Sequence, residues 1–159
     1  MSGVAASMII ISGAAHADSF SGMTTSSTDV TFTAPATPLT LTLQSENPSS
    51  GIHEDWYEVA SYKLTSTSNA RIGVRFTPTA GVVGSTENRM VFSGKSNPAH
   101  KADLQIIAPS GNHVTVGSET FWVSDTDVTD FSGTIKTNGS QTIPADTYTV
   151  SMDAVVYNP

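Results

Sequence analysis

The stretch Thr147–Tyr157, TYTVSMDAVVY, decides the fold class of this chain. Its apolar side chains stand at every second position: Tyr148, Val150, Met152, Ala154 and Val156. A period of two is the spacing of a β-strand that buries one face. This strand stops almost at Pro159, the last residue, so the sheet is expected to end abruptly.

The same alternation recurs in short segments upstream. Leu39, Leu41 and Leu43 alternate with threonines in residues 37–43. Further strands are predicted at 57–65, 70–76, 88–92, 102–108, 113–116, 119–124 and 131–136. Asn138-Gly139 predicts a type I′ turn ahead of the final strand, because both central positions of that turn need positive φ. No segment shows helical periodicity over three turns, so many short strands separated by turns predict an all-β sandwich or barrel.

The composition restricts the classes of protein to which the chain can belong. Its 159 residues carry a net charge of −7, from 7 Lys and Arg against 14 Asp and Glu. Basic clusters are missing from the sequence, which disfavours binding to nucleic acid or to anionic membranes. The absence of cysteine excludes disulfides and thiolate metal sites. The length suits one domain with its own core.

The first 36 residues read as two segments that precede this domain. Residues 1–17 resemble a secretory signal peptide, with an apolar run at Met8–Ile11 and a small-x-small cleavage pattern that ends at Ala17. No Lys or Arg precedes that run. The second segment, residues 18–36, begins with the small and polar stretch 18–27 (DSFSGMTTSS), which cannot bury enough surface to fold alone. If this segment is extended, one of its faces carries Phe20, Gly22, Val30 and Phe32.

Few residues stand in a pattern that carries chemistry. Residues 53–55, His-Glu-Asp, lack the HxH or HExxH spacing of a metal site and favour a solvated loop. Asp125, Asp127 and Asp130 form a cluster without the central glycine and terminal glutamate of a calcium loop. No GxSxG, P-loop or GxGxxG motif is present. The sequence therefore predicts no catalytic residue, no metal site and no cofactor.

Two pairs of adjacent aromatic residues, Trp56-Tyr57 and Phe121-Trp122, occur in predicted strands or at their ends. In an alternating strand one member of each pair faces the core and the other faces solvent. An exposed Trp or Tyr is able to stack on a sugar or a receptor, and it also suits an ordinary surface position.

Both ends of the chain resemble chaperone–usher pilins, and most closely the Saf-like, non-classical fimbrial subunits of Gram-negative bacteria. Near the C-terminus, Ile143–Tyr148 (IPADTY) is similar to the "PA-x-x-Y" turn of that family, and the alternating last strand follows it. Near the N-terminus, Thr28–Pro35 (TDVTFTAP) followed by Leu39–Leu43 (LTLTL) resembles a donor strand that runs into the first strand of the domain. Residues 47–139 match only in the rhythm of their strands.

This resemblance implies an incomplete immunoglobulin-like β-sandwich that spans residues 37–159 and lacks its last strand. Residues 18–36 then form an N-terminal donor-strand extension, which fills the groove of a neighbouring subunit after a periplasmic chaperone has lent a strand. The donor residues are expected to be Phe20, Gly22, Val30 and Phe32. The acceptor groove is expected to be lined by Leu39, Leu41, Leu43, Val150, Met152, Ala154 and Val156.

The implied function is that of a structural subunit of a fimbria on the bacterial cell surface, which reaches it through the periplasm and serves adhesion or biofilm formation. The implied partners are identical or related subunits, the chaperone, an outer-membrane usher and a host receptor. Because arm and groove are different surfaces, their contact is heterologous and builds an open filament.

Two alternatives stay open on the residues alone. The chain is also compatible with a self-contained secreted adhesin or carbohydrate-binding β-sandwich, in which residues 18–36 pair within their own chain. The second alternative is a secreted β-sandwich enzyme that uses a pair of acidic residues.

Overall fold

The structure is a computed structural model that describes residues 22–30, 37–84, 86 and 88–159. Residues 37–159 belong to one compact unit, and residues 22–30 belong to a separate one. The predicted signal peptide at 1–17 lies outside the described residues, and so do the predicted donor residues Phe20 and Phe32. No helix among the described residues is long and apolar enough to cross a membrane.

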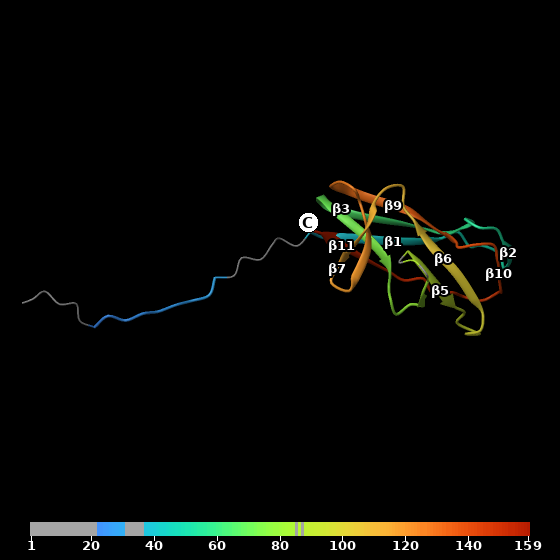
Figure 1. Cartoon of the computed structure of the whole chain (residues 1–159), viewed down its shortest axis with the longest axis horizontal. Helices are drawn as coiled ribbons and strands as arrows, with labels where there is room; N and C mark the ends of the chain where they lie inside the picture. The colour runs from blue at the N-terminus through green and yellow to red at the C-terminus, as the bar shows by residue number, and fades with distance from the viewer. Residues whose placement is uncertain (1–21, 31–36, 85, 87) are drawn as a thin grey trace, which may run out of the picture. The chain divides into compact units, whose positions relative to one another are not determined.

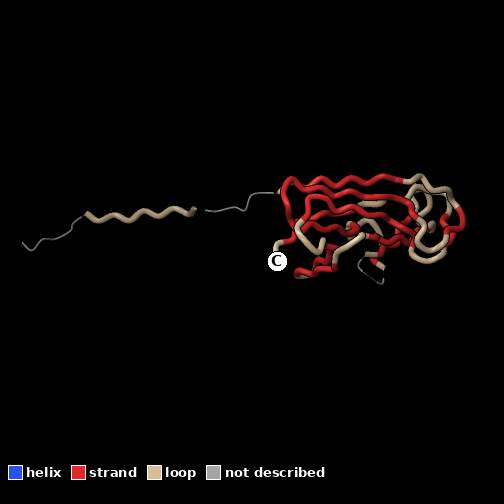
Figure 2. Tube along the Cα trace, turned by 90° about the horizontal axis from the view of Figure 1, so that it is seen from above, coloured by secondary structure: helices blue, strands red, loops and turns tan. Residues whose placement is uncertain are grey.

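The secondary structure of the compact unit consists of β-strands joined by loops and turns (Figure 2). The strands are β1 (Leu39–Ser45), β2 (Gly51–His53), β3 (Glu58–Phe76), β4 (Val82–Val83), β5 (Arg89–Ser93), β6 (Lys101–Ile107), β7 (Asn112–Val116), β8 (Glu119–Val123), β9 (Val128–Thr137), β10 (Gln141–Ile143) and β11 (Met152–Tyr157). The prediction of an all-β fold is confirmed.

The long strand β3 organises the sheet. Its first half pairs with β1 on one side and β9 on the other, whereas its second half pairs with β11 and β8. The register between β3 and β9 shifts between Thr65 and Ala70, where β3 passes from one set of partners to the next. The sheet continues from β9 through β6 and β5 to β4, and from β8 to β7. One strand thus joins both halves of a curled sheet.

The two ends of the domain differ in their contents. The short strands β2 and β10 pair with each other and lie at the end of the domain opposite the C-terminus (Figure 1). The strand β11 lies next to the C-terminus in Figure 1. The loops at the β2–β10 end connect β1 to β3 and β9 to β11.

Alternating side chains of the interior strands build the core. On β3, Tyr62, Leu64, Ile72 and Val74 are at most 3% exposed. Lys63 and Thr65, which flank Leu64, are more exposed, as the period of two requires. The buried cluster consists of Val59, Ala60, Tyr62, Leu64, Ile72, Val74, Phe76, Met90, Phe92, Ala102, Leu104, Ile106, Phe131, Ile135 and Ile143.

Several predicted boundaries were wrong. The predicted strands 57–65 and 70–76 are one strand, because β3 continues through its register shift. The last strand begins at Met152 and not at Thr147, and Tyr148 forms only an isolated bridge with Gly94. Gly139 has a φ of 77°, but Asn138 does not share a positive φ, so the predicted type I′ turn is absent there.

Candidate functional site

A groove of about 580 Å³ opens at the β2–β10 end of the domain. One wall is formed by the end of β1, residues 43–45, and by the loop 47–50 that follows it. The opposite wall is the segment 143–150 that leads into β11. Core residues of two strands, β3 and β6, form its floor: Val59, Ala60, Ala102 and Leu104. The groove therefore gives access to the hydrophobic core from outside.

One wall of this groove belongs to the edge strand β1, and the other, 143–150, leads into the edge strand β11. Among the described residues, β1 pairs with β3 alone and β11 pairs with β3 alone. The outer edge of each strand consequently presents backbone N–H and C=O groups that no strand of the described chain pairs. Such an edge is a template for another strand.

The side chains of β1 and β11 are less buried than the side chains that they pair with. Leu43 on β1 is 39% exposed, whereas Tyr62, its partner on β3, is 3% exposed. Every residue of β11 is only half-buried, although Ala154 and Val156 pair with Val74 and Ile72, which are fully buried. The core is thus covered incompletely along these two strands.

The structure divides the predicted groove residues, because only two of the seven line the groove. Leu39, Leu41, Val150, Met152, Ala154 and Val156 are partly buried and pack against the core cluster. Leu43 and Val150 line the groove itself, while Val156 borders a separate depression of about 280 Å³ beside β7 and β8. The even-numbered residues of 144–150 are half-buried and the odd-numbered ones exposed, so the expected alternation reaches upstream of β11.

The sequence analysis did not separate the segment 144–151 from the last strand, because its alternating apolar residues continue the pattern of that strand. The segment has no continuous ladder and is held by separate hydrogen bonds. The Thr77 N–H donates to the Ser151 carbonyl over 2.9 Å, and the Lys95 N–H donates to the Thr147 carbonyl over 2.9 Å. The Tyr148 hydroxyl donates to the Pro144 carbonyl over 2.9 Å.

Asp146 makes the largest set of contacts in this wall. Its carboxylate accepts hydrogen bonds from the N–H groups of Ser96, Asn97 and Thr147 at 2.7–2.9 Å. A ring nitrogen of His100 lies 3.1 Å from Oδ2. The hydrogen bond from the Ser96 N–H, together with the other donors, holds the pKa of this carboxyl well below its usual range. Asp146 therefore stays ionised while its side chain has no exposed surface.

The described part of the predicted donor arm, residues 22–30, contains no strand. All nine of its residues are exposed, with Met23 at 89% and Val30 at 69%. Gly22 has a φ of 70°. The four predicted donor residues are thus divided, since Gly22 and Val30 lie in the described part and the two phenylalanines lie outside it.

The polar clusters weighed in the sequence act as structural contacts. His53 is buried, and a ring nitrogen lies 2.7 Å from the Ser49 carbonyl. Asp125 accepts a hydrogen bond from the Gly111 N–H, and Asp130 pairs with Lys63 at 3.1 Å. Within the described ranges, no group of three or more His, Cys, Asp or Glu side chains is arranged to hold a metal ion.

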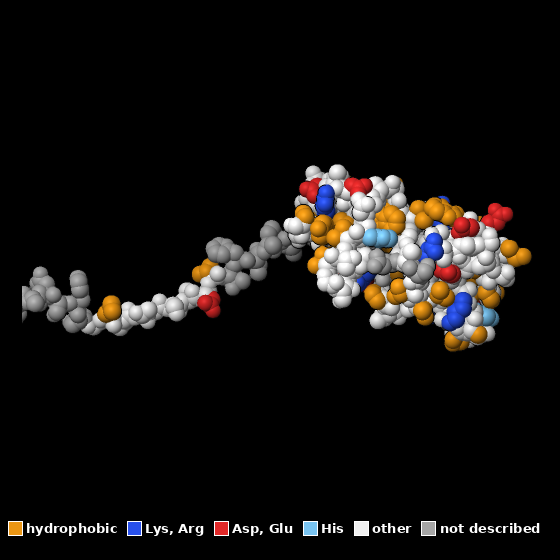
Figure 3. All heavy atoms as spheres, in the orientation of Figure 1, with side chains coloured by type: hydrophobic (Ala, Val, Ile, Leu, Met, Phe, Trp, Pro, Cys, Tyr) orange, Lys and Arg blue, Asp and Glu red, His pale blue; other side chains and the backbone are white. Residues whose placement is uncertain are grey.

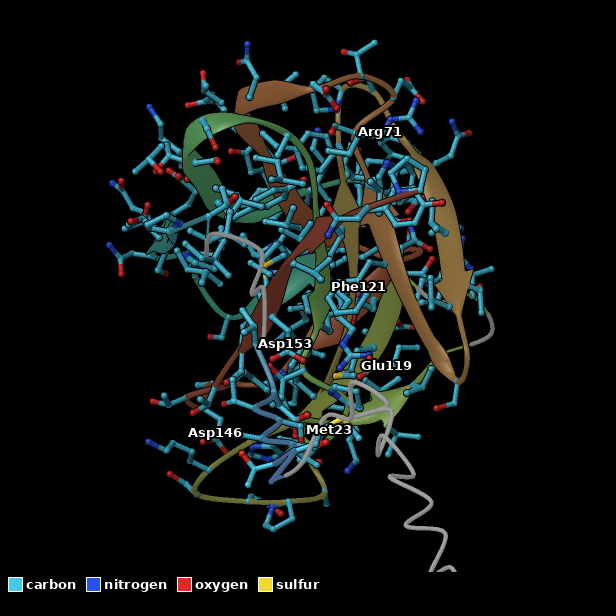
Figure 4. All side chains as sticks on the ribbon, turned by 90° about the vertical axis from the view of Figure 1, so that its left-hand side faces the viewer. Met23, Arg71, Glu119, Phe121, Asp146 and Asp153 are labelled. Atoms are coloured by element: carbon cyan, nitrogen blue, oxygen red, sulfur yellow. The ribbon has the colours of Figure 1, made fainter. Side chains whose placement is uncertain are left out.

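An ionic cluster lies on β3, β8 and β11. Arg75 pairs with Glu119 at 3.1 Å and with Asp153 at 3.0 Å, and its guanidinium lies 4.3 Å from the ring centroid of Phe121. Figure 4 shows Glu119, Phe121 and Asp153 beside one another on the domain. The Thr77 hydroxyl also donates to Asp153. These contacts connect β11 to β3 through side chains, in addition to the backbone pairing.

The turn before β3 presents an aromatic ring in an unusual backbone conformation. Trp56 has a φ of 68° and is 55% exposed. Its N–H donates to the Thr137 carbonyl over 3.1 Å, and the buried Thr137 hydroxyl donates to the Glu54 carbonyl. Lys136 Nζ lies 5.9 Å from the Trp56 ring centroid. On the face of the molecule that Figure 3 shows, exposed hydrophobic side chains are interspersed with charged ones over the whole domain.

Comparison of the sequence with known proteins gave no match to a family model or to a curated protein. The structure, in contrast, is similar to solved fimbrial subunits. The Salmonella SafD adhesin has a TM-score of 0.67 at 23% identity, over 76% of this chain and 88% of SafD. The fold is that of a fimbrial subunit.

Two further solved structures show the same fold at lower identity. HdaB, the minor tip subunit of the Escherichia coli Hda pilus, has a TM-score of 0.63 at 12% identity, over 77% of this chain and 84% of HdaB. AggB, the minor subunit of Escherichia coli aggregative adherence fimbriae type I, has a TM-score of 0.63 at 11% identity, over 74% of this chain and 84% of AggB. The predicted immunoglobulin-like fold is confirmed.

Proposed function

We propose that this chain is a structural subunit of a bacterial surface fimbria and that it polymerises by donor-strand exchange. One observation carries the proposal: the groove between β1 and 143–150 exposes core residues beside the unpaired edge of β1. A strand laid into it would pair its backbone with an edge and bury alternate side chains. Residues 18–36 of a second copy are the proposed donor, with Phe20, Gly22, Val30 and Phe32 facing inward.

The fold similarity to SafD, HdaB and AggB supports this proposal, since these proteins are an adhesin and minor fimbrial subunits. A subunit with an open groove needs protection before assembly, and a periplasmic chaperone and an outer-membrane usher are the proposed partners. The arm and the groove are separate surfaces, so each added copy presents a new vacant groove. The polymer would serve adhesion or biofilm formation at the cell surface.

The decisive experiment moves the arm. One variant of the mature chain lacks residues 18–34, and a second carries that segment after Pro159 through a short linker. The proposal expects ladders of polymer from the natural chain and a stable monomer with a raised Tm from the appended variant. A natural chain that is monomeric in solution and gains no stability from the graft would contradict the proposal.

A finer test uses the alternation of the arm. Phe32→Asp places a charge on the face proposed to enter the groove, and it should block polymerisation while chaperone binding in a pull-down is retained. Thr31→Asp is the matched control, because the adjacent side chain belongs to the opposite face. Equal loss of polymerisation in both variants would show that the added charge is responsible, whichever face of the arm carries it.

A second candidate function, ligand binding at the Trp56 turn, is favoured by the strained and exposed tryptophan. Positive φ in a bulky residue costs free energy and persists only where surrounding contacts impose it. A sugar ring is the proposed ligand, because the Trp56 side chain is largely exposed and Asp55 lies next to it in the turn. Trp56→Ala should abolish binding to immobilised glycans, whereas Trp56→Phe should retain part of it. Binding that Trp56→Ala leaves unchanged would exclude this site.

A further inference from the structure

The groove wall continues as the segment 144–151, in which Asp146 accepts more hydrogen bonds than any other residue. This segment runs past the groove without a continuous strand partner, so its position depends on the few hydrogen bonds that it makes. Asp146 supplies the acceptor for three backbone N–H groups and lies against the His100 ring. Two of these N–H groups, from Ser96 and Asn97, belong to the loop between β5 and β6.

Gly94 allows the carboxylate to come this close. A Cβ at this position would overlap Asp146 Oδ2 and would lie 2.9 Å from the Asn97 carbonyl oxygen. Both approaches are closer than van der Waals contact, so any side chain at residue 94 would displace the carboxylate or the loop. Asp146 (Figure 4) bonds to the loop between β5 and β6, whereas Glu119 and Asp153 bond to Arg75.

We propose that Asp146 is the positioning residue of the strand-acceptor groove: with Gly94, it holds the wall 144–151 in the place that a donor strand requires. This inference rests on the proposed function. Without the carboxylate, the wall would be in place in only a fraction of vacant molecules. The apparent affinity for a donor strand falls by that fraction, since only molecules with a formed groove bind.

The test uses the full chain with Phe32→Asp, whose own arm is blocked, and a labelled synthetic peptide of residues 18–36 as the probe. Asp146→Ala should weaken peptide binding about tenfold or more, since hydrogen bonds to a charged group contribute more than neutral ones. Asp146→Asn keeps one acceptor oxygen and should have a smaller effect. Gly94→Ala should reproduce the loss from the other side of the contact.

Asp125→Ala is the matched control, because Asp125 also accepts a backbone N–H, from Gly111, but does not line the groove. It should leave the peptide affinity unchanged. Hydrogen exchange supplies the second readout: Asp146→Asn should speed exchange at 147–151 while the β9 amides keep their protection. Peptide affinity in Asp146→Ala equal to that of the parent chain would overturn the proposal.

The outcomes separate this inference from the proposed function. If the parent chain does not bind the peptide at all, the donor-strand proposal fails. If it binds and the Asp146 variants bind equally well, only the positioning role fails. If the variants do not fold, hydrogen exchange in the parent chain tests the positioning role. The amides of Ser96, Asn97 and Thr147 all donate to Asp146, so they should exchange together. Independent exchange of these three amides would contradict the proposal that Asp146 holds them together.

Discussion

The strand β3 and the strands β1 and β11 that flank it carry similar alternating sequences but differ in burial. Leu64 on β3 is fully buried, while Leu41, its direct partner on β1, is only partly buried. The same difference separates Val74 from Ala154 on β11. An alternating apolar pattern thus reports which face a strand turns inward, and the number of its neighbours sets how far that face is buried.

This difference in burial distinguishes residues that stabilise the domain from residues that are accessible to a partner. The interior side chains are surrounded by the protein's own atoms and hold the domain together. The side chains of β1 and β11 remain accessible, so part of the free energy of burying them is still available for association. The variants below test this division, from the largest expected effect to the smallest.

The largest effect is expected from Leu64→Ala. Truncating a fully buried leucine leaves a cavity in the core, which should lower the free energy of unfolding by about 2–5 kcal/mol. Denaturant unfolding of the self-complemented chain, with the arm appended after Pro159, measures this loss. An effect below that of Leu41→Ala would contradict the assignment of β3 to the core.

A smaller loss is expected from Leu41→Ala in the chain with a vacant groove, because that side chain already contacts solvent. Its truncation should cost about 1 kcal/mol there, and more in the self-complemented chain, where a donor strand would complete its burial. The comparison is made by unfolding both forms in urea. Equal losses in the two forms would indicate that no strand covers Leu41.

Acid should weaken the groove wall through Asp146. Its pKa is lowered in the folded chain, so the folded state keeps this carboxylate ionised at pH values where the unfolded chain binds a proton. The stabilisation is present above about pH 4, the ordinary pKa of Asp, and is lost as pH falls toward the folded pKa. Asp146→Asn should therefore show a shallower fall in Tm below pH 4 than the parent chain. A parallel fall in both chains would count against this assignment.

The smallest effect is expected at the ion pair between Lys63 and Asp130, which joins β3 to β9 on the outer surface. Both side chains are about half exposed, so solvent screens the pair, and Lys63→Ala should change the unfolding free energy by less than about 1 kcal/mol. Added salt should reduce this difference further. A loss as large as that of Leu64→Ala would mean that surface charge contributes as much as the core.

Local patterns predicted the parts of the site that depend on alternation. Leu39 and Leu41 on β1, and Met152 and Val156 on β11, turn toward the core as their spacing indicates. Leu43 follows the same spacing but is 39% exposed, because the groove begins beside it. The spacing gives the direction of a side chain and does not show whether anything lies in front of it.

Contacts between distant residues escaped the sequence. Asp146 meets Ser96 and Asn97 across about 50 positions, and nothing in the turn IPADTY indicates which loop its carboxylate reaches. The positive φ of Trp56 was also missed, since a tryptophan carries no local preference for that conformation. The small strands β2, β4 and β10 are too short to show a period.

The sequence by itself determined that the chain forms strands and which faces of the outer strands are apolar. These properties are local, because a period of two and a turn residue act over a few neighbouring positions. Only the tertiary structure decided that β3 serves both halves of the sheet and that β1 and 143–150 enclose a groove over the core. Strand pairing and the burial of the core depend on which segments distant in sequence come into contact. Those contacts are determined by the packing of the whole domain.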